Sequence, residues 1–220
     1  MDLNRVFSWE MPTRLIVGPG CARQAGVELR KLGGTKALIV TDRGVEAAGV
    51  LAPVLEGLAS AGLAHVTYSG VEPNPSSRCV LEAASIYRAE GCDCLLGVGG
   101  GSSMDTAKVT GAALANDLDI AAMEGVGKLA RPIPSFIAVP TTCGTGAEAT
   151  PTGVITDPER HYKMPIMSTF LYPKVALIDG SLLTRLPGPV VASTGMDALC
   201  HAVESYTNLN TNPISDALDL

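Results

Sequence analysis

Residues 94–108 read CLLGVGGGSSMDTAK, and this stretch decides the fold. Its first part, Cys94 to Val98, is a short apolar run of the kind that forms a strand buried inside a parallel sheet. After the glycines, Met104 and Ala107 begin an apolar pattern with helical spacing. A strand that turns through glycines into a helix brings unpaired backbone N–H groups to the positive end of the helix dipole, where phosphate groups bind. The stretch therefore predicts a strand–turn–helix unit that binds phosphate.

A second interpretation of the same stretch is a capped helix. Ser102 would be the N-cap residue, and Asp105, three positions later, would complete a pair like a capping box. Capping accounts for these two residues but not for the successive glycines at 99–101. Phosphate binding explains more of the stretch, although the glycines do not match the G-x-G-x-x-G pattern of the usual dinucleotide fingerprint.

Strand-like and helix-like segments alternate along most of the chain. Short apolar or β-branched runs predict strands, and alanine- and leucine-rich stretches between them predict helices. This order predicts an α/β fold with a mainly parallel, Rossmann-like sheet covered by helices on both faces and ligand sites at the carboxyl ends of its strands. The expected strands are 14–18, 36–41, 64–68, 94–98, 135–139, 153–156 and 175–178, and the expected helices include 21–31, 44–61 and a helix from Ser76 or Ser77 to Glu90.

The pattern changes at residues 186–189, where Leu-Pro-Gly-Pro separates the alternating region from a helical one. We therefore expect an α/β domain over residues 1–186 and the beginning of a helical domain over residues 187–220. Asn212 and Pro213 have the form of an N-cap and first helical residue, yet the sequence stops at Leu220, about two turns later. This ending predicts an N-terminal portion of a longer protein, or a domain that another chain completes.

Composition and charge argue against several classes of protein. The net charge is −6 without a basic cluster, which does not suit nucleic acid or an anionic membrane surface as a partner. No apolar segment reaches the length of a membrane span, and the first ten residues lack the pattern of a secretory signal. The six cysteines form no C-x-x-C pair. We therefore expect a cytoplasmic protein without a zinc or redox cysteine motif.

Two residues of the helical region have the spacing of a metal-binding pair. Asp197 and His201 lie four positions apart on a helix predicted over residues 196–206, so both side chains project from one face. A carboxylate and an imidazole placed in this way can hold a divalent metal. The alternative is an ordinary ion pair or helix cap, and the otherwise apolar helix leaves these side chains either to pair with each other or to hold a ligand.

A second strand-end loop is rich in hydroxyl groups and glycines. Residues 140–148 read PTTCGTGAE and follow the predicted strand 135–139. Thr141, Thr142 and Thr145 can donate hydrogen bonds to phosphate or ribose oxygens, and glycines let the backbone approach a ligand closely. The alternative is an ordinary turn with an N-cap. Two such loops at neighbouring strand ends favour a shared ligand.

Asp42 stands at the end of the predicted strand 36–41. A carboxylate at this place commonly accepts hydrogen bonds from the ribose hydroxyls of an adenosine and repels a 2′-phosphate, which favours NAD over NADP. The alternative is that Asp42 caps the next helix. In the usual dinucleotide fingerprint the acidic residue follows the glycine loop, whereas Asp42 precedes it by two β-α units.

Together these motifs resemble those of the iron-containing (group III) alcohol dehydrogenases. The resemblance covers essentially the whole chain, with the motifs in the right order. The segments that carry it are 99–102 with Asp105 and Lys108, 140–142 with 144–146 and Glu148, 195–202 with Glu204, and the intervening 73–75 and 154–157.

The resemblance implies a dinucleotide-binding domain followed by a helical metal-binding domain, as in the dehydroquinate synthase-like architecture, with the active site between them. Asp42 would hold the adenosine ribose of NAD. The other implied cofactor-binding residues are Asn74 beside the site, Gly100, Gly101 and Ser102 at the diphosphate, Asp105 in the same motif, Thr141, Thr142 and Thr145 on the nicotinamide side, and Lys163, which reaches the cofactor.

The resemblance also implies a metal centre. Asp197 and His201 match the first two of four ligands, usually for Fe(II) and sometimes for Zn(II) or another divalent ion. The other two ligands of the family are histidines farther along the chain, and no histidine follows His201 here. His65 and His161 match no ligand position. We therefore expect the metal site of this chain to be incomplete.

The implied reaction is the reversible oxidation of a small alcohol to an aldehyde with NAD, in which a metal held by Asp197 and His201 acts as a Lewis acid. The family often dimerises through its N-terminal strands, so residues 14–17 predict a homodimer. Two alternatives stay open. One is a nucleotide-binding module without catalysis, and the other is a relative of dehydroquinate synthase or of polyol-phosphate enzymes. A phosphate-bearing substrate would need basic residues near the cleft, and the sequence shows no such cluster.

Overall fold

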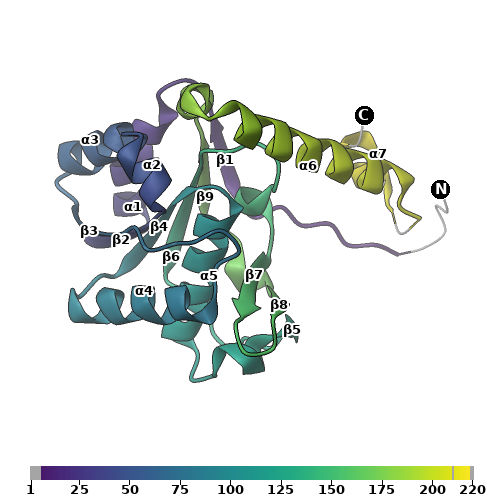
Figure 1. Cartoon of the computed structure of the whole chain (residues 1–220), viewed down its shortest axis with the longest axis horizontal. Helices are drawn as coiled ribbons and strands as arrows, with labels where there is room; N and C mark the ends of the chain where they lie inside the picture. Colours follow the sequence, from purple (N-terminus) through teal and green to yellow (C-terminus); the bar gives the residue numbers. More distant parts are fainter. Residues whose placement is uncertain (1–5, 210, 219–220) are drawn as a thin grey trace.

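The computed structural model describes residues 6–209 and 211–218, Arg185 by its backbone alone. Its centre is a six-stranded, wholly parallel sheet with the strand order β1-β9-β6-β4-β2-β3 (Figure 1). Six of the predicted strands form this sheet, so the expected Rossmann-like fold is confirmed. The strands are β1 (Arg14–Val17), β2 (Lys36–Val40), β3 (Ala64–Tyr68), β4 (Cys94–Gly99), β6 (Ser135–Pro140) and β9 (Val175–Ile178).

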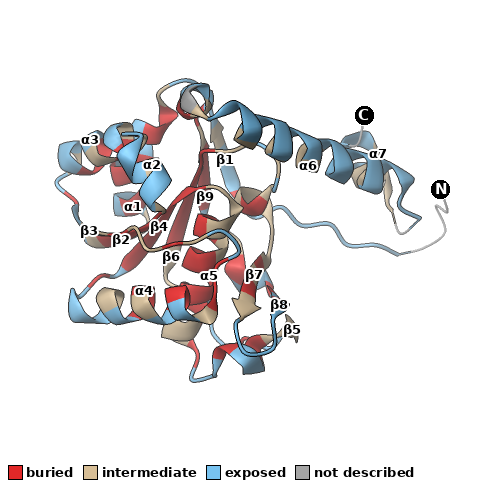
Figure 2. Cartoon of the chain, in the orientation of Figure 1, coloured by how far each residue is buried: buried red, intermediate tan, exposed pale blue. Residues whose placement is uncertain are grey.

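Helices cover both faces of this sheet because successive strand residues point to opposite sides. On one face, Leu96 and Ile137 pack in a cluster with residues of α1 (Ala25–Lys31) and α3 (Ala52–Ser60). On the other face, Leu95 and Phe136 pack with residues of α4 (Ser77–Ala89) and α5 (Gly101–Ala115). Figure 2 shows the resulting core, in which the inner strands β2, β4, β6 and β9 are buried between the two helical layers.

The prediction of one continuous helix over residues 44–61 is wrong. The structure has α2 (Arg43–Ala47) and α3, separated by a turn in which Gly49 has φ +68°. This left-handed conformation ends a helix, and glycine adopts it without strain. Pro53 then stands in the first turn of α3, where its missing N–H costs no hydrogen bond.

A smaller sheet of three strands lies beside α5, with the order β5-β8-β7 (Figure 1). Its members are β5 (Gly125–Val126), β7 (Thr152–Asp157) and β8 (Tyr162–Met167), and β7 pairs antiparallel with β8. The predicted strand 153–156 therefore exists but belongs to this sheet and not to the parallel one. Strand β8 escaped prediction because Pro165 interrupts it, and proline argues against a strand when only the sequence is read.

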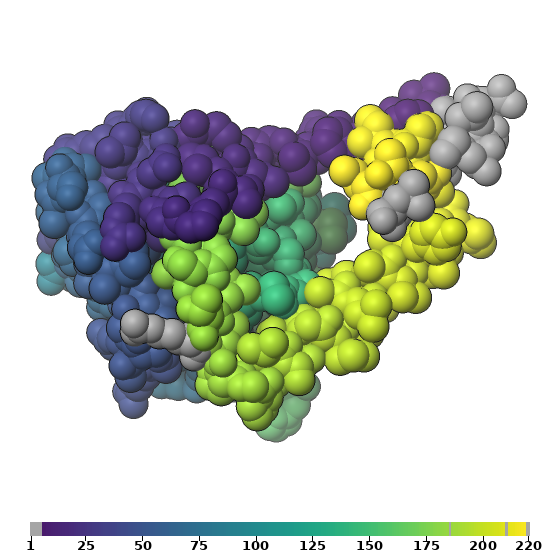
Figure 3. Space-filling view, turned by 90° about the horizontal axis from the view of Figure 1, so that it is seen from above, coloured from purple at the N-terminus to yellow at the C-terminus, as the bar shows by residue number. Residues whose placement is uncertain are grey.

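The last long helix, α6 (Gly188–Thr207), begins eight residues before the predicted residue 196. Pro189 fits its first turn, so the Leu-Pro-Gly-Pro segment contains the start of this helix. Figure 3 shows α6 and α7 (Pro213–Leu218) as an arm that extends from the body. The outer face of α6 is apolar and exposed, with Met196 58% exposed and Leu199 and Val203 each 54% exposed.

Short 3-10 helices complete the described chain. They are η1 (Cys21–Gln24), which precedes α1, η2 (Ile120–Met123), η3 (Ala147–Ala149), η4 (Thr169–Leu171) and η5 (Gly180–Arg185). Across the described ranges, no helix is both long and apolar enough to cross a bilayer. All six cysteines lie in this part of the chain and are free thiols.

Candidate functional site

The glycine turn between β4 and α5 forms the floor of the site. Strand β4 ends at Gly99, Gly100 is the N-cap residue, and α5 starts at Gly101. The prediction of Ser102 as N-cap is therefore wrong, because Ser102 is the second residue of the helix. Within the described residues, no side chain caps this helix. The first-turn N–H groups at Gly101 and Ser102 thus have no intrahelical acceptor and face the cleft at the positive end of the helix dipole.

The glycines are required because a second loop lies directly against them. A Cβ atom built on Gly101 would lie 2.9 Å from Cγ2 of Thr145, and one built on Gly100 would lie 3.3 Å from Oγ1 of Thr142. A larger residue at Gly101 would force Thr145 to shift, and one at Gly100 would crowd Thr142. The loop at residues 140–148 and the glycine turn therefore form one surface, as two neighbouring strand ends predict.

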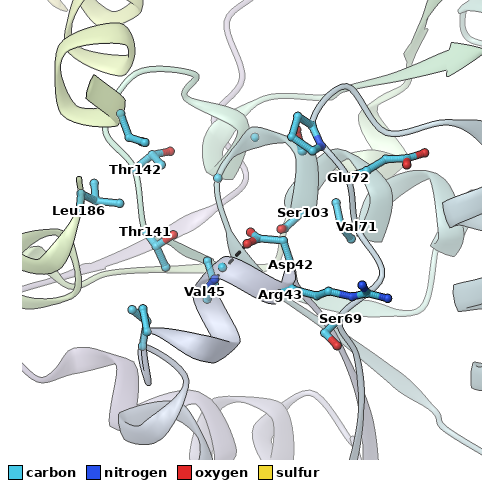
Figure 4. A pocket seen from close by; sticks show the side chains of 18 of the residues that line it. Asp42, Arg43, Val45, Ser69, Val71, Glu72, Ser103, Thr141, Thr142 and Leu186 are labelled. Atoms are coloured by element: carbon cyan, nitrogen blue, oxygen red, sulfur yellow. Dashed lines mark hydrogen bonds between the residues drawn. The ribbon is translucent and has the colours of Figure 1, made fainter. Parts of the chain in front are cut away.

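A cavity of about 1170 Å³ opens above this surface (Figure 4). Its walls come from the ends of β2, β3, β4 and β6 and from the beginning of α6. This position is the edge at which doubly wound α/β sheets bind ligands. The predicted cofactor-binding residues that line this cavity are Asp42, Asn74, Gly100, Gly101, Ser102, Thr141, Thr142 and Thr145.

Asp42 serves as the cap of α2 and also faces the cleft. Its Oδ1 accepts a hydrogen bond of 2.9 Å from the N–H of Val45, drawn in Figure 4. Its Oδ2 lies 3.5 Å from a Cβ atom built on Gly99, at the turn into α5. The two interpretations of Asp42 are therefore compatible, because one oxygen caps the helix while the other lies at the cavity wall.

Two buried hydroxyl groups at the cavity have no hydrogen-bond partner among the described residues. They belong to Thr141 and Ser103, each 1% exposed, and both residues line the cavity. A buried hydroxyl without a partner costs free energy, so such groups mark places where a ligand or water supplies the missing atom. Ser103 was not among the predicted site residues. Only its place in the first turn of α5 could have indicated it.

A second cavity, of about 560 Å³, adjoins the first. The two share Asn74, Gly101, Ser102 and Thr145 in their walls. The second cavity adds Asp105, Lys163, Asp197 and His201, which come from α5, β8 and α6. The structure thus brings every predicted site residue to one of two connected cavities.

Asn74 and Lys163 reach this region from different elements. Asn74 has φ +53° between two prolines, a left-handed conformation that asparagine tolerates better than most residues. Lys163 lies on β8 opposite Thr156 of β7, and its exposed side chain lines the second cavity. The small sheet therefore brings a cationic side chain to the cleft.

Helix α6 approaches the site closely at the second loop. Nδ1 of His201 lies 3.0 Å from the carbonyl oxygen of Gly144. A Cβ atom built on Gly144 would lie 2.5 Å from the carbonyl oxygen of Thr194 and 3.2 Å from Oδ2 of Asp197. Because a carbonyl only accepts, His201 donates from Nδ1, and in the neutral imidazole the lone pair is then on Nε2.

The donor pair on α6 fits a divalent metal in type and spacing but not in number. Asp197 and His201 supply one carboxylate and one imidazole. Over residues 6–209 and 211–218, no group of three or more His, Cys, Asp or Glu side chains could hold a metal. A catalytic site needs about three protein ligands. The two donors on α6 fall short of this number.

Asp105 and Lys108 are neighbouring charged residues of α5, and Asp105 lies at the wall of the second cavity. Burial raises the pKa of Asp105 to about 6, against the opposing effect of Lys108. Burial also lowers the pKa of Lys108 to about 8, against the effects of Asp105 and Glu148. Asp105 faces the cavity, but its carboxylate accepts a hydrogen bond of 3.1 Å from the N–H of Val154. This residue therefore also holds β7.

Comparison with known proteins agrees with the motifs and the geometry. The family model "Iron-containing alcohol dehydrogenase" matches residues 12–180, and the model "Fe-containing alcohol dehydrogenase family, C-terminal" matches residues 191–220. Choline dehydrogenase of Bacillus subtilis (strain 168) is 42% identical over 222 residues, which cover 100% of this chain and 55% of that protein. NAD-dependent methanol dehydrogenase of Bacillus methanolicus is 37% identical over 207 residues, or 94% of this chain and 54% of that protein.

The fold comparison gives the same result. A crystal structure of 1,3-propanediol oxidoreductase matches with a TM-score of 0.95 and 38% identity, over 98% of this chain and 56% of that chain. The chain spans about half the length of the curated relatives it matches. It belongs to the family of iron-containing alcohol dehydrogenases.

Proposed function

We propose that this chain provides the cofactor-binding part of an NAD-dependent oxidoreductase that interconverts small alcohols and aldehydes with the help of a divalent metal. In this proposal residues 1–186 form the dinucleotide-binding domain, and residues 187–220 begin the helical metal-binding domain. The observation that carries the proposal is the pair of connected cavities, which lead from Asp42 past the glycine turn to Asp197 and His201.

Different parts of the cavity walls carry chemical groups that suit different parts of a dinucleotide. At one end, Asp42 has a carboxylate oxygen free of its capping bond, suited to ribose hydroxyls. In the middle, the N–H groups of Gly101 and Ser102 stand at a helix N-terminus, suited to a diphosphate. Thr145 and Lys163 follow, toward α6. We assign this last region to the nicotinamide, together with Thr141 and Thr142, with Asn74 at the border of the site and Asp105 in the same motif as the glycine turn.

We assign Asp197 and His201 as metal ligands, with Fe(II) as the expected ion and Zn(II) or another divalent ion as substitutes. A metal at this pair supplies Lewis-acid chemistry for the substrate oxygen. The protein's own contribution is orientation. The carbonyl of Gly144 fixes the imidazole of His201, and the loop that holds Gly144 also touches the glycine turn through Thr145. Substrate, cofactor and metal would therefore be positioned by one continuous piece of backbone.

We also propose where the protein is located in the cell and how it assembles. The free cysteines fit a reducing compartment, so we propose a cytoplasmic location. Strand β1 is at one edge of the parallel sheet, and Val17 on it is 69% exposed. An exposed edge strand can pair with another copy of itself. We propose that this edge forms a homodimer.

Titration of the chain with NADH tests the proposal. We expect saturable binding that NADPH competes for poorly. Gly101→Val places a side chain against Thr145 and should weaken NADH binding by about tenfold or more, since it blocks the diphosphate site. Gly180→Ala is the matched control, because a Cβ atom there meets nothing within 4 Å. A wild-type chain that does not bind NADH, or a Gly101→Val chain that binds it as tightly as the wild type, would contradict the proposal.

A further inference from the structure

Lys108 is a fully buried cationic residue outside both cavities. Its relative exposure is 0%, and it lines neither the first nor the second cavity. Its Nζ donates hydrogen bonds of 2.8 Å to the carbonyl oxygens of Thr150 and Thr152 and one of 3.2 Å to Oγ1 of Thr150. An ammonium group has three donors. All three are therefore used on one short segment, at the beginning of β7.

Strand β7 is the edge strand of the small sheet that lies next to α5. An edge strand has a row of backbone groups without a neighbouring strand. At β7 two side chains of α5 take the place of that neighbour. Lys108 donates to the carbonyl of Thr152, and Asp105 accepts from the N–H of Val154. These alternate residues present their backbone groups to the same side.

The packing between α5 and β7 leaves no room for a side chain at Gly153. A Cβ atom built on Gly153 would lie 2.8 Å from Cγ2 of Val109. The strand is thus held by one polar contact before Gly153, at the carbonyl of Thr152, and one after it, at the N–H of Val154. Removal of Lys108 would leave the carbonyl oxygens of Thr150 and Thr152 without this donor, and a buried acceptor left unpaired costs free energy.

We propose that Lys108 is a positioning residue for the wall of the second cavity. Helix α5 carries the glycine turn at its first residue, and Lys108 fixes β7 to the same helix. Strand β7 in turn pairs with β8, which carries Lys163 into the cavity. Lys108 therefore sets the distance between the diphosphate site and the nicotinamide end of the cleft. Its charge is supported by the nearby carboxylates Asp105 and Glu148, which oppose the lowering of its pKa by burial.

This inference rests on the proposed function. The binding of two ligands distinguishes a failure of this inference from a failure of the proposed function. ADP-ribose carries the adenosine and diphosphate groups, and NADH adds the nicotinamide. The variant Lys108→Met keeps an apolar side chain of similar length and removes the donors. We expect it to weaken NADH by about fivefold to tenfold while ADP-ribose changes by less than about twofold, since only the nicotinamide end moves. The control Lys174→Met removes an exposed lysine and should change neither affinity.

Amide hydrogen exchange gives the second measurement. In Lys108→Met, exchange at Val154 should become about tenfold faster, while Leu96 in the central strand β4 stays protected. Thr150→Val removes only the hydroxyl acceptor and should produce a smaller increase at Val154, which decides the matter if Lys108→Met does not fold. Equal losses of NADH and ADP-ribose, or unchanged exchange at Val154 in both variants, would overturn this inference alone. A wild-type chain that binds neither ligand would overturn the proposed function together with it.

Discussion

The imidazole Nδ1 of His201 lies 3.0 Å from the carbonyl oxygen of Gly144. This contact joins helix α6 to the loop that follows β6, across 57 residues of sequence. In the neutral ring this contact favours the tautomer that carries the proton on Nδ1 and the lone pair on Nε2. The pair that we propose as metal ligands and the loop that we propose for the cofactor are therefore in direct contact.

The absence of a side chain at Gly144 should be essential for this contact. Gly144→Ala places a methyl group 2.5 Å from the carbonyl oxygen of Thr194, so α6 must move. We expect a loss of about 1–3 kcal/mol in the free energy of unfolding, as overpacking costs elsewhere. Urea unfolding measures it. Gly195→Ala is the control on α6 itself, because a Cβ atom there meets nothing within 4 Å. Equal stability of the two variants would contradict the close approach.

Asp42 should affect stability and cofactor choice separately. Asp42→Asn keeps an oxygen that can accept from the N–H of Val45 but removes the charge. We expect the free energy of unfolding to change little and the preference for NADH over NADPH to fall by about tenfold, since the repulsion of a 2′-phosphate is lost.

Asp42→Ala should lose both properties, with a further cost of about 1 kcal/mol for the missing cap. Thermal unfolding and parallel titrations with the two cofactors measure the two effects. The assignment of Asp42 to the ribose would be wrong if the asparagine variant still discriminated fully between NADH and NADPH.

Much of the fold could be predicted from the sequence because its signals are local. Apolar runs such as 94–98 mark strands whatever their neighbours are, and the glycines at 99–101 mark a turn that only glycine can make. The site positions at strand ends follow from the same rule. This is why Asp42 and Thr145 could be named as candidates before their contacts were known.

Other features depend on contacts that no local pattern records. Pro165 argues against a strand, yet β8 forms because Met164 and Ile166 alternate into the core. The helix over 44–61 is divided by the conformation of Gly49, whereas glycine in other helices is tolerated. The role of Lys108 is also invisible in the sequence, because a lysine on a helix is ordinarily exposed. The roles of the predicted site residues themselves stay predictions.

The pair of Asp105 and Lys108 predicts a pH dependence of stability. The pKa of Asp105 is raised in the folded protein, from 3.8 to about 6, so the folded state binds a proton more tightly than the unfolded state does. The contribution of Asp105 to the free energy of unfolding should therefore be greatest below pH 3.8. This contribution should be lost as the pH rises toward 6.

The comparison of wild type with Asp105→Asn isolates this effect. Asparagine is neutral at every pH and can still accept from the N–H of Val154. The wild type should lose on the order of 1–3 kcal/mol relative to this variant between about pH 4 and pH 6. Urea unfolding at a series of pH values measures the difference. If the difference in the free energy of unfolding between the two proteins is the same at every pH, burial does not shift the pKa of Asp105.

Metal binding by this chain should be weak and should depend on α6. With two donors among the described residues, Zn(II) should bind far less tightly than at a site with three or four protein ligands. Asp197→Ala and His201→Ala should each reduce that affinity by about tenfold and leave NADH binding unchanged, since the ligands act on the metal directly. His65→Ala, on the exposed face of β3, is the control. Unchanged Zn(II) affinity in both α6 variants would refute the assignment.

The most direct test of the account is a crystal structure of the chain with NAD⁺. We expect the diphosphate to accept hydrogen bonds from the N–H groups of Gly101 and Ser102. We expect the adenosine ribose to lie at Asp42 and the nicotinamide to point toward Asp197 and His201. A cofactor bound elsewhere, or one that enters the cleft in the opposite direction, would contradict it.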